Sequence, residues 1–256
     1  MSISTAILAD APSLYWPLDD PTGPAASDAS GNAQPGVYVG TFQLHQPGPE
    51  VGTFAALLQD GGLIQSLNTS PRKIRPFSMD CWVGLEMLQT DRNTFLYNGN
   101  GNANGMGQLW TAGAAGVGNP IAIILGGNAV GAAVGNVSLG VWHHVGFSSD
   151  AAQITNMYID GVNVYLNQNT GPMNAIGATD KVQIGANKAG QLLYMAHVAL
   201  YPAVITAARF LAHFQANVTA QSPQPVGGVT STSQQTIIDQ LGSLLGWVAR
   251  DLRNTP

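Results

Sequence analysis

The chain has 256 residues and a formal net charge of −5, and only 9% of its residues are charged, against roughly 25% in an average globular protein. Nucleic-acid binding is excluded as a function, because it depends on a basic surface that neutralises phosphates and the chain offers only nine Lys and Arg residues. The single cysteine, Cys81, excludes an internal disulfide framework and a cysteine-rich zinc site.

Residues 1–20 lack the basic start and the long apolar run of a secretory signal peptide, so we expect a protein made in the cytoplasm without one. Residues 93–149 contain no Lys, Arg, Asp or Glu, but Gly and Asn interrupt them throughout. That pattern does not fit a membrane-spanning segment, and we expect no membrane insertion.

Residues 1–217 form one predicted all-β domain, because short apolar alternations are separated by Gly, Asn, Pro and Asp clusters. The clearest predicted strand is 77–86. Its odd-numbered positions place Cys81 on an apolar face, and its even-numbered positions place Asp80, Trp82 and Glu86 on the other. Cys81 is therefore predicted to be a small core residue.

Further strands are predicted over 140–148, 181–185 and 191–201. Residues 155–166 predict a hairpin, because Asp160-Gly161 supplies the positive backbone φ angles of a tight turn. Over 206–217 the apolar residues change from the spacing of a strand to that of a helix. This predicts a short amphipathic helix with Thr206 as its N-cap. Residues 98–119 are rich in Gly and Asn and are interpreted as loop, with Trp110 as the anchor of a binding loop if the loop has a function.

A polar linker is predicted over 218–235 and an amphipathic C-terminal helix over 236–256. This helix carries an apolar stripe at spacings of three and four residues: Ile237, Leu241, Leu244, Val248 and Leu252. A helix this short is marginal alone, so the stripe must be buried by its own domain, by other copies of the chain or by another protein.

Four stretches together resemble the laminin-G-like branch of the concanavalin A-like lectin and glucanase superfamily. They are 15–19 with 28–32 and 36–38, then 77–83, then 142–145 with 157–161, and 198–201 leading into 206–209. The resemblance implies a two-sheet antiparallel jelly-roll sandwich with a short edge helix. Many members of that superfamily bind carbohydrate or protein partners, and many carry calcium.

For calcium, the oxygen-rich turn at Asp28 and Asn32, with Asp19 nearby, offers candidate ligands. The acid that the family usually places before its closing strand is absent, since residues 195–198 read Met-Ala-His-Val. The alternative is a turn that the Asp28 side chain holds by its own hydrogen bonds.

For a sugar, Asp80 and Trp82 form a candidate strip on one strand face, and Trp110 and Tyr97 are candidates near loop tips. The alternative is that Trp82 is covered by loops or by the second sheet. A glycoside hydrolase is disfavoured. Asp80 and Glu86 are about 20 Å apart along a strand, whereas retaining enzymes need two carboxylates about 5 Å apart. The adjacent His143 and His144 are expected on opposite faces of their strand, where they cannot share a metal. We therefore expect a protein that is not an enzyme.

A nearly uncharged, Gly- and Ala-rich module of this kind without a signal peptide resembles the minor tail proteins of phages. The sequence therefore predicts a virion protein on the phage tail or capsid surface. Its partners would be other virion proteins and a host cell-surface polysaccharide, and it would be a homo-oligomer, with a trimer as our expectation. The alternative is an architectural decoration or spacer protein without a ligand.

Overall fold

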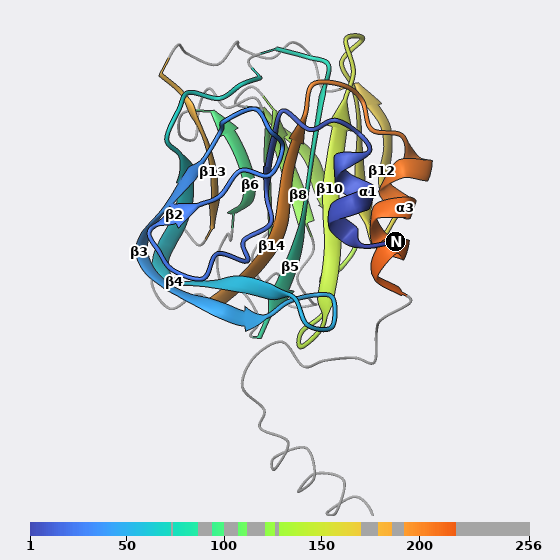
Figure 1. Ribbon diagram of the computed structural model, residues 1–256. Helices are drawn as coiled ribbons and strands as arrows, with labels where there is room; N and C mark the ends of the chain where they lie inside the picture. Colours follow the sequence, from blue (N-terminus) through green and yellow to red (C-terminus); the bar gives the residue numbers. More distant parts are fainter. Residues whose placement is uncertain are drawn as a thin grey trace, which may run out of the picture. The chain divides into compact units, whose positions relative to one another are not determined.

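The computed structural model describes residues 1–72, 74–86, 94–99, 107–111, 121–125, 128–169, 179–185 and 192–218 (Figure 1). All of them lie in the first of two compact units, residues 1–226 and 227–256. The predicted linker and C-terminal helix, with Ile237, Leu241, Leu244, Val248 and Leu252, lie outside the described residues apart from Val218.

Two helices and fourteen strands follow in chain order within the described residues. The first half contains α1 (Ile3–Leu8), β1 (Leu14–Trp16), β2 (Ala25–Ala26), β3 (Gly36–Pro47), β4 (Phe54–Ser66), β5 (Phe77–Leu85), β6 (Thr94–Gly99) and β7 (Gly107–Thr111). The second half contains β8 (Ile121–Leu125), β9 (Asn128–Val134), β10 (Trp142–Ser149), β11 (Ile154–Ile159), β12 (Val162–Asn169), β13 (Lys181–Gly185), β14 (Leu192–Tyr201) and α3 (Ala207–Val218).

The named strands pair antiparallel, and the main hydrogen-bonded path runs β12-β11-β10-β5-β14-β4-β13-β6-β7-β8-β9. The sheet closes into a sandwich, because β5, β10 and β14 face β6, β8 and β13 across one apolar core. We call the cluster of buried apolar side chains between these two layers the sandwich core. This arrangement confirms the predicted all-β jelly-roll sandwich.

Strand β5 lies at the centre of its layer, between β10 and β14. Its residues Phe77, Met79, Cys81, Val83 and Leu85 all belong to the sandwich core. Trp82, on the opposite face, belongs to a second buried cluster with residues of α1 and α3. We call this second side of β5 the helix-covered face. The predicted division of the strand into two faces is confirmed, and Cys81 is a buried free cysteine as predicted.

The predicted hairpin is present as β11 and β12, with φ angles of 52° at Asp160 and 75° at Gly161. The predicted helix is α3, where the backbone N–H of Arg209 donates to the Thr206 hydroxyl at 3.4 Å and to its carbonyl at 3.0 Å. Figure 1 shows α1 and α3 side by side at one side of the sandwich. No helix among the described residues is long and apolar enough to cross a membrane.

Two elements differ from the sequence prediction. Residues 107–111, interpreted as loop, form β7, because this segment pairs on both sides with β6 and β8 despite its glycines. Helix α1 was not predicted at all. Ser2 caps it, since the Ser2 hydroxyl accepts the Thr5 backbone N–H at 3.2 Å, and the helix buries Ile3 and Ile7 against the helix-covered face.

Candidate functional site

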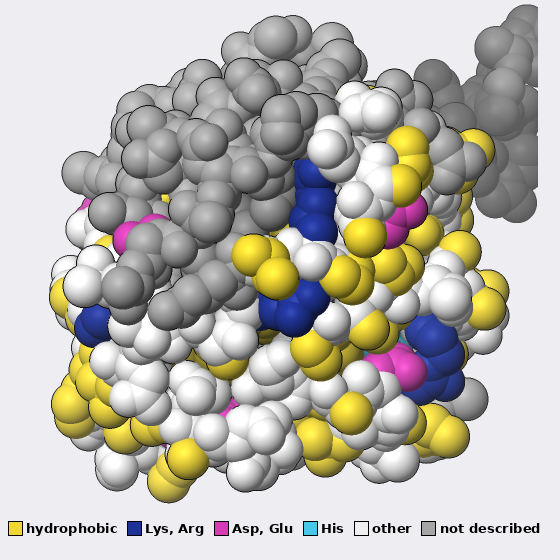
Figure 2. All heavy atoms as spheres, turned by 90° about the horizontal axis from the view of Figure 1, so that it is seen from above, with side chains coloured by type: hydrophobic (Ala, Val, Ile, Leu, Met, Phe, Trp, Pro, Cys, Tyr) yellow, Lys and Arg dark blue, Asp and Glu magenta, His cyan; other side chains and the backbone are white. Residues whose placement is uncertain are grey.

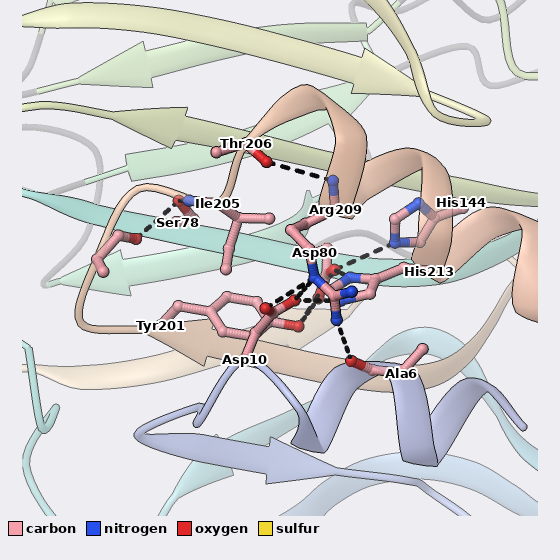
Figure 3. Close-up of polar contacts among 11 residues, drawn as sticks. Ala6, Asp10, Ser78, Asp80, His144, Tyr201, Ile205, Thr206, Arg209 and His213 are labelled. Carbon is pink, nitrogen blue, oxygen red and sulfur yellow. Dashed lines mark hydrogen bonds and ion pairs between the residues drawn. The ribbon is translucent and has the colours of Figure 1, made fainter. Parts of the chain in front are cut away.

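A network of charged side chains is buried between β5 and the two helices (Figure 3). Asp80 on β5 is its centre and is 0% exposed. The residues paired with Asp80 on the neighbouring strands are Gly146 and Ala199. Because these two are small, the sheet leaves room for a side chain that reaches Asp80 from α3, and His213 takes that room.

His213 lies between two carboxylates. Its Nδ1 is 2.7 Å from Asp80 Oδ2, and its Nε2 is 2.7 Å from Asp10 Oδ2. A carboxylate only accepts hydrogen bonds, so both ring nitrogens must carry a proton and the ring is an imidazolium. Burial disfavours this charged form, but the hydrogen bonds and charges of Asp80 and Asp10 outweigh burial and raise the pKa of His213.

Asp80 accepts hydrogen bonds from two further groups. The Tyr201 hydroxyl donates to Oδ1 at 3.0 Å, and His144 Nε2 lies 3.2 Å from Oδ2. Burial by itself would raise the pKa of Asp80, yet the hydrogen bonds from His144 and His213 and the nearby positive charge of His213 lower it to about 2. Asp80 is therefore a buried carboxylate that stays ionised.

Arg209 connects this network to solvent. Its Nε donates to both Asp10 oxygens, at 2.8 and 2.9 Å, and its Nη2 donates to the Ala6 carbonyl at 3.1 Å. The Arg209 side chain is 37% exposed and that of Asp10 is 14% exposed. The network therefore ties α1, α3 and the sheet together by an alternating series of positive and negative groups.

A further buried histidine, His197 on β14, lies on the same face. Its Nδ1 is 2.7 Å from the Tyr15 hydroxyl, which is 2.8 Å from the Ser4 hydroxyl. Burial without a carboxylate partner lowers the pKa of His197 to about 4, so this ring is neutral. The helix-covered face thus holds a charged His213 and a neutral His197.

The predicted sugar-binding side chains on the strands are buried. Trp82 and Asp80 are 0% exposed, and Tyr97 is 6% exposed. The Trp82 ring centroid lies 6.0 Å from that of Phe214, with an interplanar angle of 22°. The prediction of an exposed Trp82 ring is wrong, because α3 covers the ring. The alternative correctly predicted that Trp82 is covered, but by loops or the second sheet and not by a helix. Trp110 lies on β7 opposite Thr94 and Ala122, and its side chain falls outside the described part of the chain.

The predicted calcium ligands form a hydrogen-bonded turn. Asp28 Oδ1 accepts the backbone N–H groups of Tyr15 and Ser30, and Oδ2 accepts the Ser30 hydroxyl and the Gln34 N–H. Burial opposes ionisation of Asp28, but these donors lower its pKa. Asn32 points its amide nitrogen at the Pro12 carbonyl, at 3.0 Å, and Asp19 is exposed. Because four donors already occupy the Asp28 carboxylate, the turn fits the hydrogen-bonded alternative better than a calcium site.

His143 and His144 point to opposite faces, as predicted: His144 is in the charge network, whereas His143 lies near the surface. His143 Nδ1 is 2.7 Å from Asp160 Oδ2, and its Nε2 is 2.7 Å from the Ser138 hydroxyl, which is the residue order of a hydrolase triad. However, the Ser138 backbone N–H also donates to Nε2, at 3.1 Å. The imidazole therefore anchors the turn before β10, and that N–H is directed at the ring instead of at a substrate oxyanion.

Sequence reasoning missed Asp10, Arg209 and His213 as members of one cluster. A signal was present for His213, because it follows Phe210 by three residues and therefore lies on the apolar face of the predicted helix. A histidine on that face needs a buried partner. Its partner is 133 residues away in the chain, so no local spacing links the two.

The chain belongs to the family described as the concanavalin A-like lectin/glucanases superfamily, whose model matches residues 60–209. No curated protein sequence matches it.

Several solved structures share the fold. Domain 4 of AbnA, an extracellular arabinanase from Geobacillus stearothermophilus in complex with arabinotriose, is 19% identical with a TM-score of 0.61, over 80% of this chain and 98% of that domain. A botulinum neurotoxin type C structure, described as dependent on two ganglioside molecules for cell entry, is 14% identical with a TM-score of 0.62, over 84% of this chain and 53% of that one. Trypanosoma rangeli sialidase is 13% identical with a TM-score of 0.59, over 78% of this chain and 32% of the sialidase chain.

Proposed function

We propose that the chain is a glycan-binding module on the surface of a phage particle, and that it works as a minor tail protein that adheres to host polysaccharide. The observation that carries the glycan-binding part is the similarity to domain 4 of AbnA, because the match spans 98% of a domain whose structure contains arabinotriose. The similarity to botulinum neurotoxin type C, whose cell entry depends on two ganglioside molecules, supports the same class of ligand.

The placement on a virion rests on composition. With 9% charged residues, the chain presents a surface of uncharged side chains, and Figure 2 shows one face where charged groups are few and scattered. The predicted C-terminal helix would hold the module to other virion proteins or to other copies of itself, with a trimer as the expected assembly. The proposal includes no catalytic step.

The test of adhesion is a binding screen of the full chain against a glycan array and purified host cell walls, with calcium and with a chelator. We expect binding to at least one surface polysaccharide. Loss of binding in chelator would assign a role to calcium, and unchanged binding would remove calcium from the proposal. A folded chain that binds no glycan and no cell wall would contradict the proposal.

Two variants locate the binding surface. We expect Trp110→Ala to lower glycan affinity about tenfold or more, as expected for loss of an aromatic ring that stacks on a ligand. The matched control is Phe54→Ala, because Phe54 is an aromatic residue 41% exposed at the start of β4. If Phe54→Ala abolishes binding and Trp110→Ala does not, the binding surface lies on β3 and β4 instead.

The assembly is tested separately by light scattering. We expect Leu241→Asp combined with Leu244→Asp to convert an oligomer into a monomer, because a charge at each position would interrupt the predicted apolar stripe. The same oligomer in both proteins would remove the tail from the proposal.

The burial of Trp82 and Tyr97 favours a second candidate, an architectural protein without a ligand. In that case the sandwich serves as a rigid spacer or decoration. The two candidates differ in the glycan screen, whereas both require the chain to be incorporated into particles. Incorporation without any glycan binding would favour the architectural role.

A further inference from the structure

The charge network contains three side chains whose donor atoms converge on one point. They are Asp80 from β5, His144 from β10 and His213 from α3, and one ligand atom of each lies within 4.8 Å of the others. All three are 0% exposed. Figure 3 shows the two imidazole rings directed at the Asp80 carboxylate from different elements.

We propose that Asp80, His144 and His213 form a buried site for a divalent transition-metal ion, with zinc as the best match. Two imidazole nitrogens and one carboxylate oxygen are a ligand set typical of zinc, whereas calcium and magnesium prefer oxygen ligands only. This site is separate from the Asp28 turn and goes beyond the proposed glycan binding.

The surroundings of His213 support this assignment independently of the three ligand atoms. A histidine that binds a metal usually donates its other ring N–H to a carboxylate, which fixes the ring and makes it a better ligand. His213 does this through Nε2, which lies 2.7 Å from Asp10 Oδ2. Arg209 holds Asp10 in turn through both of its oxygens. His213 Nδ1 therefore faces Asp80 in a fixed orientation.

His144 can supply its Nε2 lone pair to a metal, because the proton on Nε2 can be carried by Nδ1 instead. Nε2 lies 3.2 Å from Asp80 Oδ2, and Nδ1 is buried and has no hydrogen-bond partner among the described residues. Moving the proton from Nε2 to Nδ1 leaves Nε2 free to bind the ion. The Tyr201 hydroxyl, 3.0 Å from Asp80 Oδ1, adds a further oxygen to the cluster.

Two of the three ligand spacings require only a small adjustment, and the third pair, His144 and His213, lies within 4.8 Å and must close to about 3.3 Å. Two ligands about 2.0 Å from a tetrahedral ion are roughly 3.3 Å apart. His144 Nε2 and Asp80 Oδ2 already have this spacing, at 3.2 Å. His213 Nδ1 and Asp80 Oδ2 are 2.7 Å apart because a proton joins them, so the ion would replace that proton and separate the pair by about 0.6 Å.

The charge of the cluster also favours a cation. When His213 is neutral, Asp80 and Asp10 carry two negative charges against the single positive charge of Arg209. A proton on His213 balances the remaining negative charge in the absence of metal, whereas a divalent ion that replaces this proton leaves the cluster with one net positive charge. Since the ligands are fully buried, the ion would enter while α3 docks during folding or when that helix opens locally.

The test uses the full chain, unfolded in a chelator and refolded with zinc, with cobalt or without metal, and then dialysed. We expect about one zinc per chain by elemental analysis, and visible absorption bands of four-coordinate cobalt in the cobalt sample. With free zinc about a hundredfold above its Kd, the melting temperature should rise by roughly 5–10 °C. A refolded chain that retains no zinc and shows no shift in melting temperature would overturn the proposal.

Variants identify the ligands. His144→Gln and His213→Gln should each abolish retention of zinc and the cobalt bands, whereas His45→Gln should leave both unchanged. His45 is the matched control, because it is exposed on β3, outside the network. If His213→Gln does not fold, the wild-type measurement and His144→Gln still decide. Normal retention of zinc in His144→Gln would place the ion elsewhere and contradict the assignment.

Discussion

The two faces of strand β5 are built by different chemistry. Toward the opposite layer of the sandwich, Met79, Cys81 and Val83 pack against other apolar side chains in the sandwich core. Toward α1 and α3, Asp80 is surrounded by histidines, a tyrosine hydroxyl and a second carboxylate reached through His213. Both faces are completely buried, although one contains charges and the other contains none.

This difference shows how a sheet face determines what can cover it. Apolar packing is non-directional and tolerates repacking with side chains of similar volume. The helix-covered face instead requires particular partners, because each buried charge is costly unless it is paired. We infer that the network fixes where α1 and α3 sit, while the sandwich core supplies most of the stability.

The largest expected effect comes from Asp80→Ala. This change leaves the charged His213 without its partner on the sheet and should destabilise the protein by about 3–5 kcal/mol. Cys81→Ala, the neighbouring position on the sandwich core, should cost only about 1 kcal/mol. Urea unfolding of both variants measures the difference, and equal losses would remove the distinction between the two faces.

The second effect is on the pH dependence of stability in metal-free protein. The folded-state pKa of His197 is about 4, below its ordinary value of 6.5. The unfolded chain therefore binds the proton between these values, and about 3 kcal/mol of stability is lost as pH falls from 6.5 to 4. The folded-state pKa of His213 is raised, so its contribution is complete below pH 6.5 and is lost as pH rises through that raised pKa.

Stability should thus be highest near pH 6.5 if these two histidines dominate, and thermal unfolding across pH 4 to 9 measures this. His197→Gln should flatten the acidic side of the curve and leave the alkaline side unchanged. An acidic side that is unaffected by His197→Gln would contradict the assignment.

A smaller effect is expected at Gly146, where α3 approaches β10. A Cβ atom there would lie 2.6 Å from Phe210 Cε1 and 2.8 Å from the Met79 carbonyl oxygen. Gly146→Ala should therefore cost about 1–3 kcal/mol, because the helix must shift. Chemical denaturation gives the value, and no loss of stability would show that α3 is not held as closely as the distances indicate.

The smallest effect is expected for Arg209→Ala. Its side chain is 37% exposed, so solvent screens the ion pair with Asp10 and the loss should be at most about 1 kcal/mol. The loss should shrink further in high salt. A loss as large as that of Asp80→Ala would mean that the outer end of the network carries as much stability as its centre.

Patterns within single strands predicted the fold well. Alternation along 77–86 gave the two faces of β5, and Asp160-Gly161 gave the turn between β11 and β12. The Gly- and Asn-rich composition of 98–119 was misleading, since β7 forms there through pairing with its neighbours. Composition describes a segment alone, whereas a strand depends on the strands beside it.

The site was less accessible to prediction, because its members are distant in sequence. Asp80 was correctly placed on the side of β5 opposite Cys81, but as an open ligand-binding position next to Trp82. Helix α3 covers that side. Its position there depends on the path that the chain takes after β14. No spacing within the sequence states that His213 reaches Asp80.

The central claim is that the helix-covered face holds a charged His213 and a neutral His197 at fixed positions. The most direct measurement is a nitrogen-15 NMR titration of the imidazole side chains in metal-free, full-length protein. The account predicts that His213 titrates above 6.5 with both nitrogens protonated below that point, and that His197 titrates near 4. Titration of both rings near 6.5, or a neutral His213 at pH 6, would contradict it.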